Sequence, residues 1–238
     1  MNIIPAIDLY NGKCVRLYQG RFDDMTVYSH DAVATARDYR AQGATQLHII
    51  DLNGAECGTF TQLELILAIK KATSLTLQVG GGLRNIEPIQ SVLECNIDKV
   101  IIGSLAVNNP SAVKMLLSHY GVARIVLALD VTIGDEILVV THGWQITSSL
   151  NLDTLLKQYQ AFSGLQILCT DVSRDGTLSG PNFELYADCT QRFPQFQFQA
   201  SGGVRNTSDL IQLKQCNVAA VIIGKALYES RIILNEIF

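Results

Sequence analysis

Eight short runs of apolar and β-branched residues recur along the chain at nearly even spacing. Few polar residues interrupt them, which is typical of strands covered on both faces, as in a parallel sheet wrapped by helices. Between the runs, apolar residues recur at helical spacing, for example at Ile86, Ile89 and Val92. The predicted strands span residues 3–9, 46–52, 75–79, 99–102, 124–131, 165–172, 196–200 and 219–223.

These runs predict a closed (β/α)8 TIM barrel that forms a single domain over residues 1–238. Divided into eight units, the 238 residues give about thirty residues each, enough for one strand and one helix. Asp31 is predicted to begin one helix and Asn206 another, because both residue types cap helix N-termini. No linker or low-complexity segment divides the chain, which favours a closed barrel over an open sheet.

The sequence also repeats itself at half its length. Residues 78–85 match residues 199–206 at five of eight positions, and residues 95–103 match residues 216–224 at six of nine, both with an offset of 121. Two further pairs of strand-end acids follow nearly the same step, 122 from Asp8 to Asp130 and 120 from Asp51 to Asp171. The repeat predicts two half-barrels, about 1–120 and 121–238, related by an approximate two-fold axis.

Composition excludes several classes of protein. The 18 basic and 22 acidic residues give a net charge of −4, and no basic run exceeds two residues, so a nucleic-acid partner is not expected. No stretch approaches the roughly 18 apolar residues of a membrane helix, and the six cysteines contain no Cys-X-X-Cys pair. We expect a soluble, cytoplasmic monomer with reduced thiols and with no metal site or membrane contact.

Glycine-rich turns follow four of the predicted strands, at the face where all parallel strands of a barrel end. Glycine at such a turn often serves only the shape of the backbone. It also lets backbone amides approach an anion, and the next helix adds its positive end. Because the turns occur twice at one spacing, they predict two phosphate sites across the mouth and a long ligand with a phosphate at each end. The residues are Gly81, Gly82, Gly103 and Ser104 in one half, and Ser201, Gly202, Gly203, Gly224 and Lys225 in the other.

Two acids lie between these predicted phosphate sites. Asp8 and Asp130 end the first and fifth strands, which are opposite each other in a ring of eight. A carboxylate at a strand end is often structural, but a facing pair suits general acid–base catalysis, because unlike environments separate the two pKa values. Cysteine, histidine and lysine show no such pairing, so covalent catalysis has weaker support.

Other residues at this face are candidates for ligand contacts. Trp144, the only tryptophan, follows a predicted hairpin at 136–141 and can stack on a planar ring or pack within its loop. A second predicted hairpin at 12–20 forms a mobile lid from which Arg16 reaches a phosphate. The segment 169–177 brings polar side chains to the face, and His48 is at least as compatible with a core position as with a ligand contact.

Several motifs together resemble one enzyme family across nearly the whole chain. It is similar to the phosphoribosylformimino-5-aminoimidazole carboxamide ribotide isomerases of histidine biosynthesis, which are two-fold-repeated (β/α)8 barrels. The motifs are Pro5-Ala6-Ile7-Asp8-Leu9, Gly81-Gly82-Leu83-Arg84, Gly143-Trp144, Asp175-Gly176-Thr177-Leu178 and Ser201-Gly202-Gly203.

The resemblance implies an Amadori rearrangement, in which an aminoaldose becomes an aminoketose, on a substrate with two ribose phosphates and without a cofactor. It implies that Asp130 is the general acid and Asp8 the general base. Thr170 and Asp175 would hold the opened sugar, and Trp144 would stack on the imidazole. Arg16 and Arg84 would fix the substrate, which Gly176 would also contact. The loop at 55–60 is less basic than in many relatives, which leaves the substrate contacts on that side open.

Alternatives remain at this point. The cyclase subunit of imidazole glycerol phosphate synthase shares the repeat and the paired aspartates. It usually has a cysteine where Ala6 stands, however, and has no counterpart of Trp144. A dual-substrate isomerase that also accepts phosphoribosylanthranilate uses the same chemistry. A non-catalytic sensor would keep the phosphate sites, but the presence of both aspartates argues against it.

Overall fold

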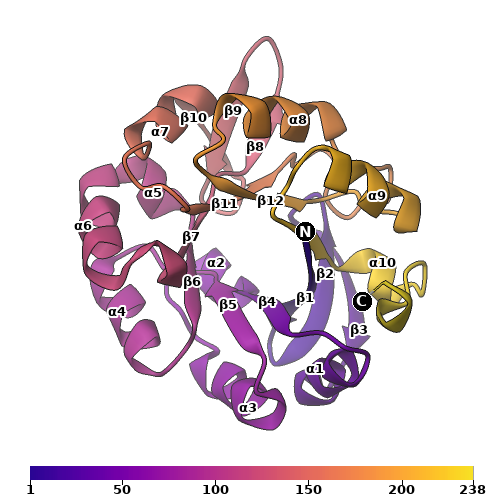
Figure 1. Cartoon of the computed structure of the whole chain (residues 1–238). Coiled ribbons are helices and arrows are strands. Elements are labelled where there is room, and N and C mark those ends of the chain that lie inside the picture. The colour runs from indigo at the N-terminus through magenta and orange to yellow at the C-terminus, as the bar shows by residue number, and fades with distance from the viewer. Residues whose placement is uncertain (238) are drawn as a thin grey trace.

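Eight parallel strands close into a barrel in the computed structural model, which describes residues 1–237 (Figure 1). The ring closes because β1 pairs with β13 through its first half and with β4 through its second. The predicted (β/α)8 barrel is therefore confirmed. The barrel strands, in spatial order, are β1 (Asn2–Tyr10), β4 (Gln46–Asp51), β5 (Thr76–Gly80), β6 (Lys99–Ile102), β7 (Ile125–Ala128), β11 (Gln166–Thr170), β12 (Gln197–Ser201) and β13 (Ala220–Ile223).

Helices follow every barrel strand and form the outer ring in Figure 1. The two predicted helix starts are confirmed: the Asp31 side chain accepts a hydrogen bond from the Ala34 amide at 2.8 Å, and that of Asn206 from the Asp209 amide at 3.2 Å. Within residues 1–237, no helix has both the length and the apolar character needed to cross a membrane. The helices are α1 (Ala32–Ala41), α2 (Leu52–Cys57), α3 (Leu63–Thr73), α4 (Ile86–Glu94), α5 (Ser104–Asn108), α6 (Pro110–Tyr120), α7 (Leu152–Gln158), α8 (Phe183–Arg192), α9 (Thr207–Gln215) and α10 (Lys225–Tyr228).

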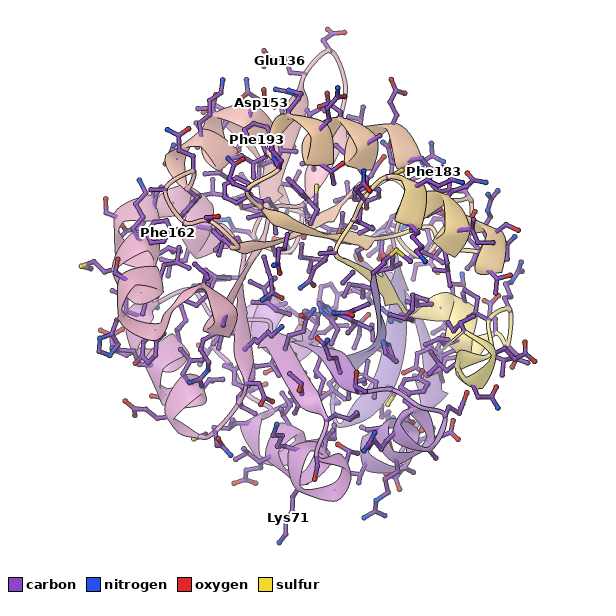
Figure 2. All side chains as sticks on the ribbon, viewed as in Figure 1. Lys71, Glu136, Asp153, Phe162, Phe183 and Phe193 are labelled. Atoms are coloured by element: carbon purple, nitrogen blue, oxygen red, sulfur yellow. The ribbon has the colours of Figure 1, made fainter. Side chains whose placement is uncertain are left out.

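The core has two parts, separated by the wall of the barrel. A large cluster packs the outer face of the strands against the helices, and a smaller one, which includes Ile4, Val126 and Leu168, fills the inside of the barrel. Figure 2 shows side chains projecting into the centre of the ring, so the barrel is packed and not a pore. Two buried amides, Gln78 and Gln199, lie within this interior, each 1% exposed. These two residues are equivalent in the predicted sequence repeat.

The loop after β7 differs from its predicted form. The run 124–131 is not one strand, because β7 ends at Ala128 and the chain resumes as β8 (Val131–Ile133). β8 pairs with β9 (Ile137–Thr141), which pairs with β10 (Ile146–Asn151), so the excursion is a three-stranded antiparallel sheet. The predicted hairpin at 136–141 covers one arm only, and Glu136 lies in the turn, at the outer tip in Figure 2.

The loop after β1 is longer than predicted. β2 (Lys13–Tyr18) runs antiparallel to β1, and a further strand, β3 (Arg21–Ser29), pairs with the other edge of β2. The prediction of antiparallel structure at 12–20 is thus confirmed, and β3 is an addition to it. β3 extends this edge of the barrel wall beside the mouth (Figure 1).

Candidate active site

Two adjoining cavities open where the barrel strands end. The larger, of about 230 Å³, and the smaller, of about 40 Å³, share Arg16, Asp175 and Ser201 in their linings. Every residue of the predicted site lines one or both. The larger cavity also has Asp8, Gly81, Gly82, Arg84, Gly103, Ser104, Asp130, Trp144 and Thr170 in its wall, and the smaller has Gly176, Gly202, Gly203, Gly224 and Lys225.

Asp8 forms a buried ion pair with Arg16. The residue lies on β1 opposite Val15 of β2, so the neighbouring Arg16 brings its Nη1 to 2.8 Å from Asp8 Oδ2. The Arg16 Nη2 also donates to the Ala6 carbonyl at 3.0 Å. Burial raises the pKa of Asp8, and the guanidinium opposes that effect. A cation in direct contact favours the ionised carboxylate, which is the form that a general base requires.

Asp130 has a different environment, without a cation in contact. The Trp144 indole Nε1 donates to its Oδ2 at 2.8 Å, while its Oδ1 is buried and has no hydrogen-bond partner. Burial raises the pKa of Asp130, opposed by hydrogen bonds from Trp144 and Thr170. With neutral donors only, and one oxygen unpartnered, this carboxyl retains its proton more readily than Asp8 does. The two aspartates thus differ in the direction that an acid–base pair requires.

Asp175 adds a third carboxyl to the same cavity. It lies in the loop after β11, and burial raises its pKa to about 6, with Arg16 opposing the rise and the charges of Asp8 and Asp130 adding to it. Arg16 therefore faces Asp8 and Asp175, whereas Asp130 has no cation in contact. Burial, with the neighbouring charges adding to it, therefore leaves Asp175 half protonated near pH 6, where a small change in nearby charge alters its protonation.

The first glycine-rich turn is shaped by its contacts with the backbone. Gly81 and Gly82 have φ of +101° and +74°, and a Cβ on either would overlap backbone atoms of the neighbouring loop at 51–59. The close approach of the two backbones therefore requires glycine at both positions, and phosphate binding at this turn remains a prediction. Two groups beside them can reach an anion: the Arg84 guanidinium, whose Nη2 donates to the Ala55 carbonyl at 2.6 Å, and the Ser104 hydroxyl, which accepts from the His142 amide at 2.9 Å.

The second glycine-rich turn carries more positive charge. Gly202 and Gly203 have φ of +88° and +79°, and a Cβ at Gly224 would overlap the Arg16 guanidinium. The Lys225 Nζ donates to the Gly176 carbonyl at 2.8 Å. Two cations, Arg16 and Lys225, thus face the smaller cavity, in which an anion would find both charge and backbone amides.

Three loops meet over the mouth. The Gln19 amide donates to the Asp175 carbonyl at 3.2 Å and its side chain to the Ser173 carbonyl at 2.9 Å, which joins the β2–β3 turn to the loop after β11. The same turn contacts the loop after β7, because the Trp144 ring occupies the space where a Cβ of Gly20 would lie. Trp144 therefore packs within the loops and still lines the cavity.

Strand-end acids outside the predicted site are structural. Asp51 is fully buried and accepts hydrogen bonds from the amides of Gly54 at 2.8 Å and Gln62 at 3.0 Å. Asp171, its equivalent in the sequence repeat, accepts from the Ser173 amide at 3.0 Å and from Asn182 at 2.8 Å. Among residues 1–237, no group of three or more His, Cys, Asp or Glu side chains is arranged to hold a metal ion.

Two histidines that the sequence left undecided or unmentioned line the cavity. The His48 Nδ1 lies 2.9 Å from the Gln78 amide nitrogen, and burial, with a smaller effect of Arg16, lowers the pKa of His48 to about 3. His48 is therefore a neutral, cavity-lining residue. His142 precedes Gly143 and Trp144 in the same loop. Its position close to the tryptophan in the sequence was the only feature that could have predicted a place in the cavity.

Comparisons with known proteins agree with this geometry. A family profile described as histidine biosynthesis protein matches residues 2–233. A protein of Francisella philomiragia named 1-(5-phosphoribosyl)-5-((5-phosphoribosylamino)methylideneamino) imidazole-4-carboxamide isomerase is 48% identical over 237 residues, covering 99% of this chain and 98% of the relative. Proteins of that name from Alteromonas mediterranea and Elusimicrobium minutum are 47% and 46% identical, covering 98% and 99% of this chain and 96% and 98% of the relatives.

Proposed function

The chain belongs to the histidine biosynthesis protein family, and from that premise we propose that it is the isomerase that converts phosphoribosylformimino-5-aminoimidazole carboxamide ribotide to its phosphoribulosyl form. The observation that carries the proposal is one cavity bordered by two aspartates, Asp8 on β1 and Asp130 between β7 and β8, one paired with a cation and one not. The relatives carry the isomerase name, which favours this reaction over that of the cyclase.

The substrate spans the mouth between the two glycine-rich turns. One ribose phosphate lies against Gly202, Gly203 and Gly224, with Arg16 and Lys225 as its cations. The other lies against Gly81, Gly82, Gly103 and Ser104, with Arg84 nearby. The neighbouring positions of these residues in the linings of the two cavities support this assignment. A helix begins directly after each of Gly103 and Gly224, so amides at those turns point outward from a helix start.

Asp130 begins the reaction as the general acid. Its proton passes to the ring oxygen of the aminoaldose ribose, the C1–O bond breaks, and the nitrogen lone pair forms a protonated imine at C1. The raised pKa of Asp130, caused by burial, supports this role. Thr170 and Asp175 hold the opened sugar, and Trp144 stacks on the imidazole while its indole nitrogen holds Asp130 in place.

Asp8 completes the rearrangement as the general base. It removes the proton from C2, and the electron pair of the C–H bond forms the C1=C2 double bond of an enolaminol as the imine nitrogen recovers its lone pair. The enolaminol then gains a proton at C1 and loses the proton of the 2-hydroxyl, which gives the ketone. The ion pair with Arg16 keeps Asp8 ionised for the abstraction.

Turnover of the aminoaldose by the wild type, Asp8→Asn and Asp130→Asn tests the proposal. Each substitution should lower kcat by about 10²–10⁴-fold and change KM much less, since it removes a proton-transfer group. Asp135→Asn, at an exposed hairpin turn, is the matched control and should keep wild-type kinetics. Near-normal turnover by Asp8→Asn, or none by the wild type, would contradict the assignment. A parallel assay with phosphoribosylanthranilate determines whether the isomerase accepts both substrates.

We also propose that residues 1–238 act as one domain and as a monomer, without a metal or organic cofactor. The predicted site residues from both halves of the sequence line two adjoining cavities of one barrel, which supports the single domain. Light scattering on the active protein tests the monomer, and turnover after dialysis against a chelator tests the metal. A dimer whose dissociation abolishes activity, or loss of activity that a metal ion restores, would refute it.

A further inference from the structure

A row of hydrogen-bonded side chains crosses the inside of the barrel. The Lys99 Nζ donates to Gln166 Oε1 at 3.0 Å, and the Gln199 Nε2 donates to the same oxygen at 2.9 Å. Gln199 and Gln78 exchange two amide hydrogen bonds, of 2.9 and 3.2 Å. The Gln78 Nε2 lies 2.9 Å from the Nδ1 of His48. Five side chains therefore form one continuous chain of contacts.

This chain connects the two ends of the barrel. Lys99 and Gln166 are the first residues of β6 and β11, at the end opposite the mouth. Gln78 and Gln199 lie in the middle of β5 and β12 and are each 1% exposed. His48, in β4, lines the larger cavity. A cation at the far end is thus linked to a ring in the wall of the larger cavity.

The chain has a direction, which Lys99 determines. An ammonium group can only donate, so the atom of Gln166 that faces it must be the amide oxygen. That oxygen can only accept, so Gln199 must present its NH₂ group to it and its own oxygen to Gln78. Gln78 then presents its NH₂ group to both Gln199 and His48, and the His48 Nδ1 must be the acceptor.

We propose that Lys99 is a positioning residue, which through Gln166, Gln199 and Gln78 holds His48 as the neutral tautomer with its proton on Nε2. An imidazole whose Nδ1 accepts carries its proton on the other nitrogen, which is the ring atom left to donate into the cavity. The Nε2–H then serves as a fixed hydrogen-bond donor to a ligand oxygen. Its use in turnover rests on the proposed isomerase function, whereas the tautomer itself does not.

Without Lys99 the direction is no longer imposed. The three amides can then rotate together, which keeps every amide–amide hydrogen bond but turns the Gln78 oxygen towards His48. The proton moves to Nδ1, and Nε2 becomes an acceptor. If both directions become equally populated, the fraction of molecules with a donor in the cavity falls by about twofold. More of the activity is lost if the reversed direction is the more stable one.

Nitrogen NMR of the imidazole rings in the full-length, ligand-free protein tests the tautomer directly. Protonated and unprotonated ring nitrogens resonate in separate ranges, and the signals that disappear in His48→Gln identify His48 among the four histidines. We expect a protonated Nε2 and an unprotonated Nδ1 in the wild type. A protonated Nδ1 there would overturn the proposal, whatever reaction the protein catalyses.

Matched variants test the role of Lys99. Lys99→Met and Gln166→Met break the chain and should give a mixture of tautomers, whereas Lys99→Arg, which also only donates, and Gln166→Glu, which still accepts, should restore the wild-type spectrum. Lys71→Met is the control, since Lys71 points away from the barrel in Figure 2. An unchanged tautomer in both methionine variants would overturn the proposal. If one of them does not fold, the other gives the result.

Steady-state kinetics with the aminoaldose add a functional measurement. Lys99→Met should lower kcat/KM by about twofold or more at an unchanged thermal midpoint, and Lys99→Arg should restore it. A tautomer mixture with unchanged kcat/KM would remove His48 from the reaction and leave the proposed function intact. Wild-type protein that does not turn over the substrate but shows the expected tautomer would refute only the proposed function.

Discussion

Replacing Asp175 with asparagine should stabilise the folded protein at neutral and alkaline pH and give no such advantage in acid. Asp175 shares its cavity with Asp8 and Asp130, and burial together with those charges raises its pKa from 3.8 to about 6. The folded state therefore holds the proton more tightly than the unfolded chain does. The contribution of this carboxyl to stability is complete below about pH 3.8 and is lost as the pH rises through about 6. Asparagine cannot ionise and does not incur this loss.

The size of the effect follows from the pKa difference. From 3.8 to about 6 is roughly two pH units, which at 1.36 kcal/mol per unit is about 3 kcal/mol. This is an upper value, because Asp175 is partly exposed and solvent screens its charge. The stability of Asp175→Asn relative to the wild type, measured as the difference in unfolding free energy, should thus be about 2–3 kcal/mol greater at pH 8 than at pH 4.

Urea unfolding across this pH range measures the difference directly. Comparing one pair of proteins at two pH values cancels the fixed effect of exchanging an acid for an amide. Asp135→Asn, at an exposed turn, is the control and should give a flat difference across the range. A flat difference for Asp175→Asn as well, or one that grows towards acid pH, would refute the crowding of carboxyl groups inferred for the cavity.

Three further substitutions test other contacts of the site. Gly20→Ala places a methyl group where the Trp144 ring lies. We expect shifted tryptophan fluorescence and a KM raised by about three- to tenfold, which is the equivalent of a lost stacking contact. An unchanged fluorescence spectrum would show that the two loops do not meet. Trp144→Phe keeps a ring but removes the hydrogen-bond donor to Asp130, which raises the pKa of this acid further. The alkaline limb of the pH profile of kcat/KM should therefore move to higher pH. A shift to lower pH would reverse the role given to Asp130. Asp51→Asn places an NH₂ group among amide donors and should cost about 2–3 kcal/mol in urea unfolding with kcat unchanged, whereas a fall in kcat would assign Asp51 a part in the reaction.

The barrel could be predicted because its strands are covered on both faces and therefore appear as uninterrupted apolar runs. β3 (Arg21–Ser29) lacked that signal, since all of its residues are exposed or partly exposed and, among residues 1–237, it pairs only with β2. The end of β7 was not predictable either. Apolar residues continue through Leu129 and Val131, but Val131 belongs to the antiparallel sheet over the mouth. Local pattern does not show where a buried barrel strand ends and a short strand of a following loop begins.

The members of the site could be predicted from the repeat, but their environments could not. Asp8 and Asp130 are symmetric in the sequence, whereas their partners differ: the loop after β1 brings Arg16 and the loop after β7 brings Trp144. Only the docking of these loops shows that one acid faces a cation and the other an indole. The contacts of Gln78 were similarly hidden, because the sequence shows a polar residue in a strand and not the direction of its amide.

The position of Arg16 has a consequence for how distant parts of a ligand communicate. Its guanidinium bonds to Asp8 and lies over the turn at Gly224. A phosphate that settles on this turn binds the same guanidinium that keeps Asp8 ionised, so it fixes Arg16 where the base requires it. A truncated sugar without that phosphate would leave Arg16 without its second anion. Such a fragment would react slowly even at saturating concentration, because binding energy at one end of the ligand is used to position the cation beside the base at its centre.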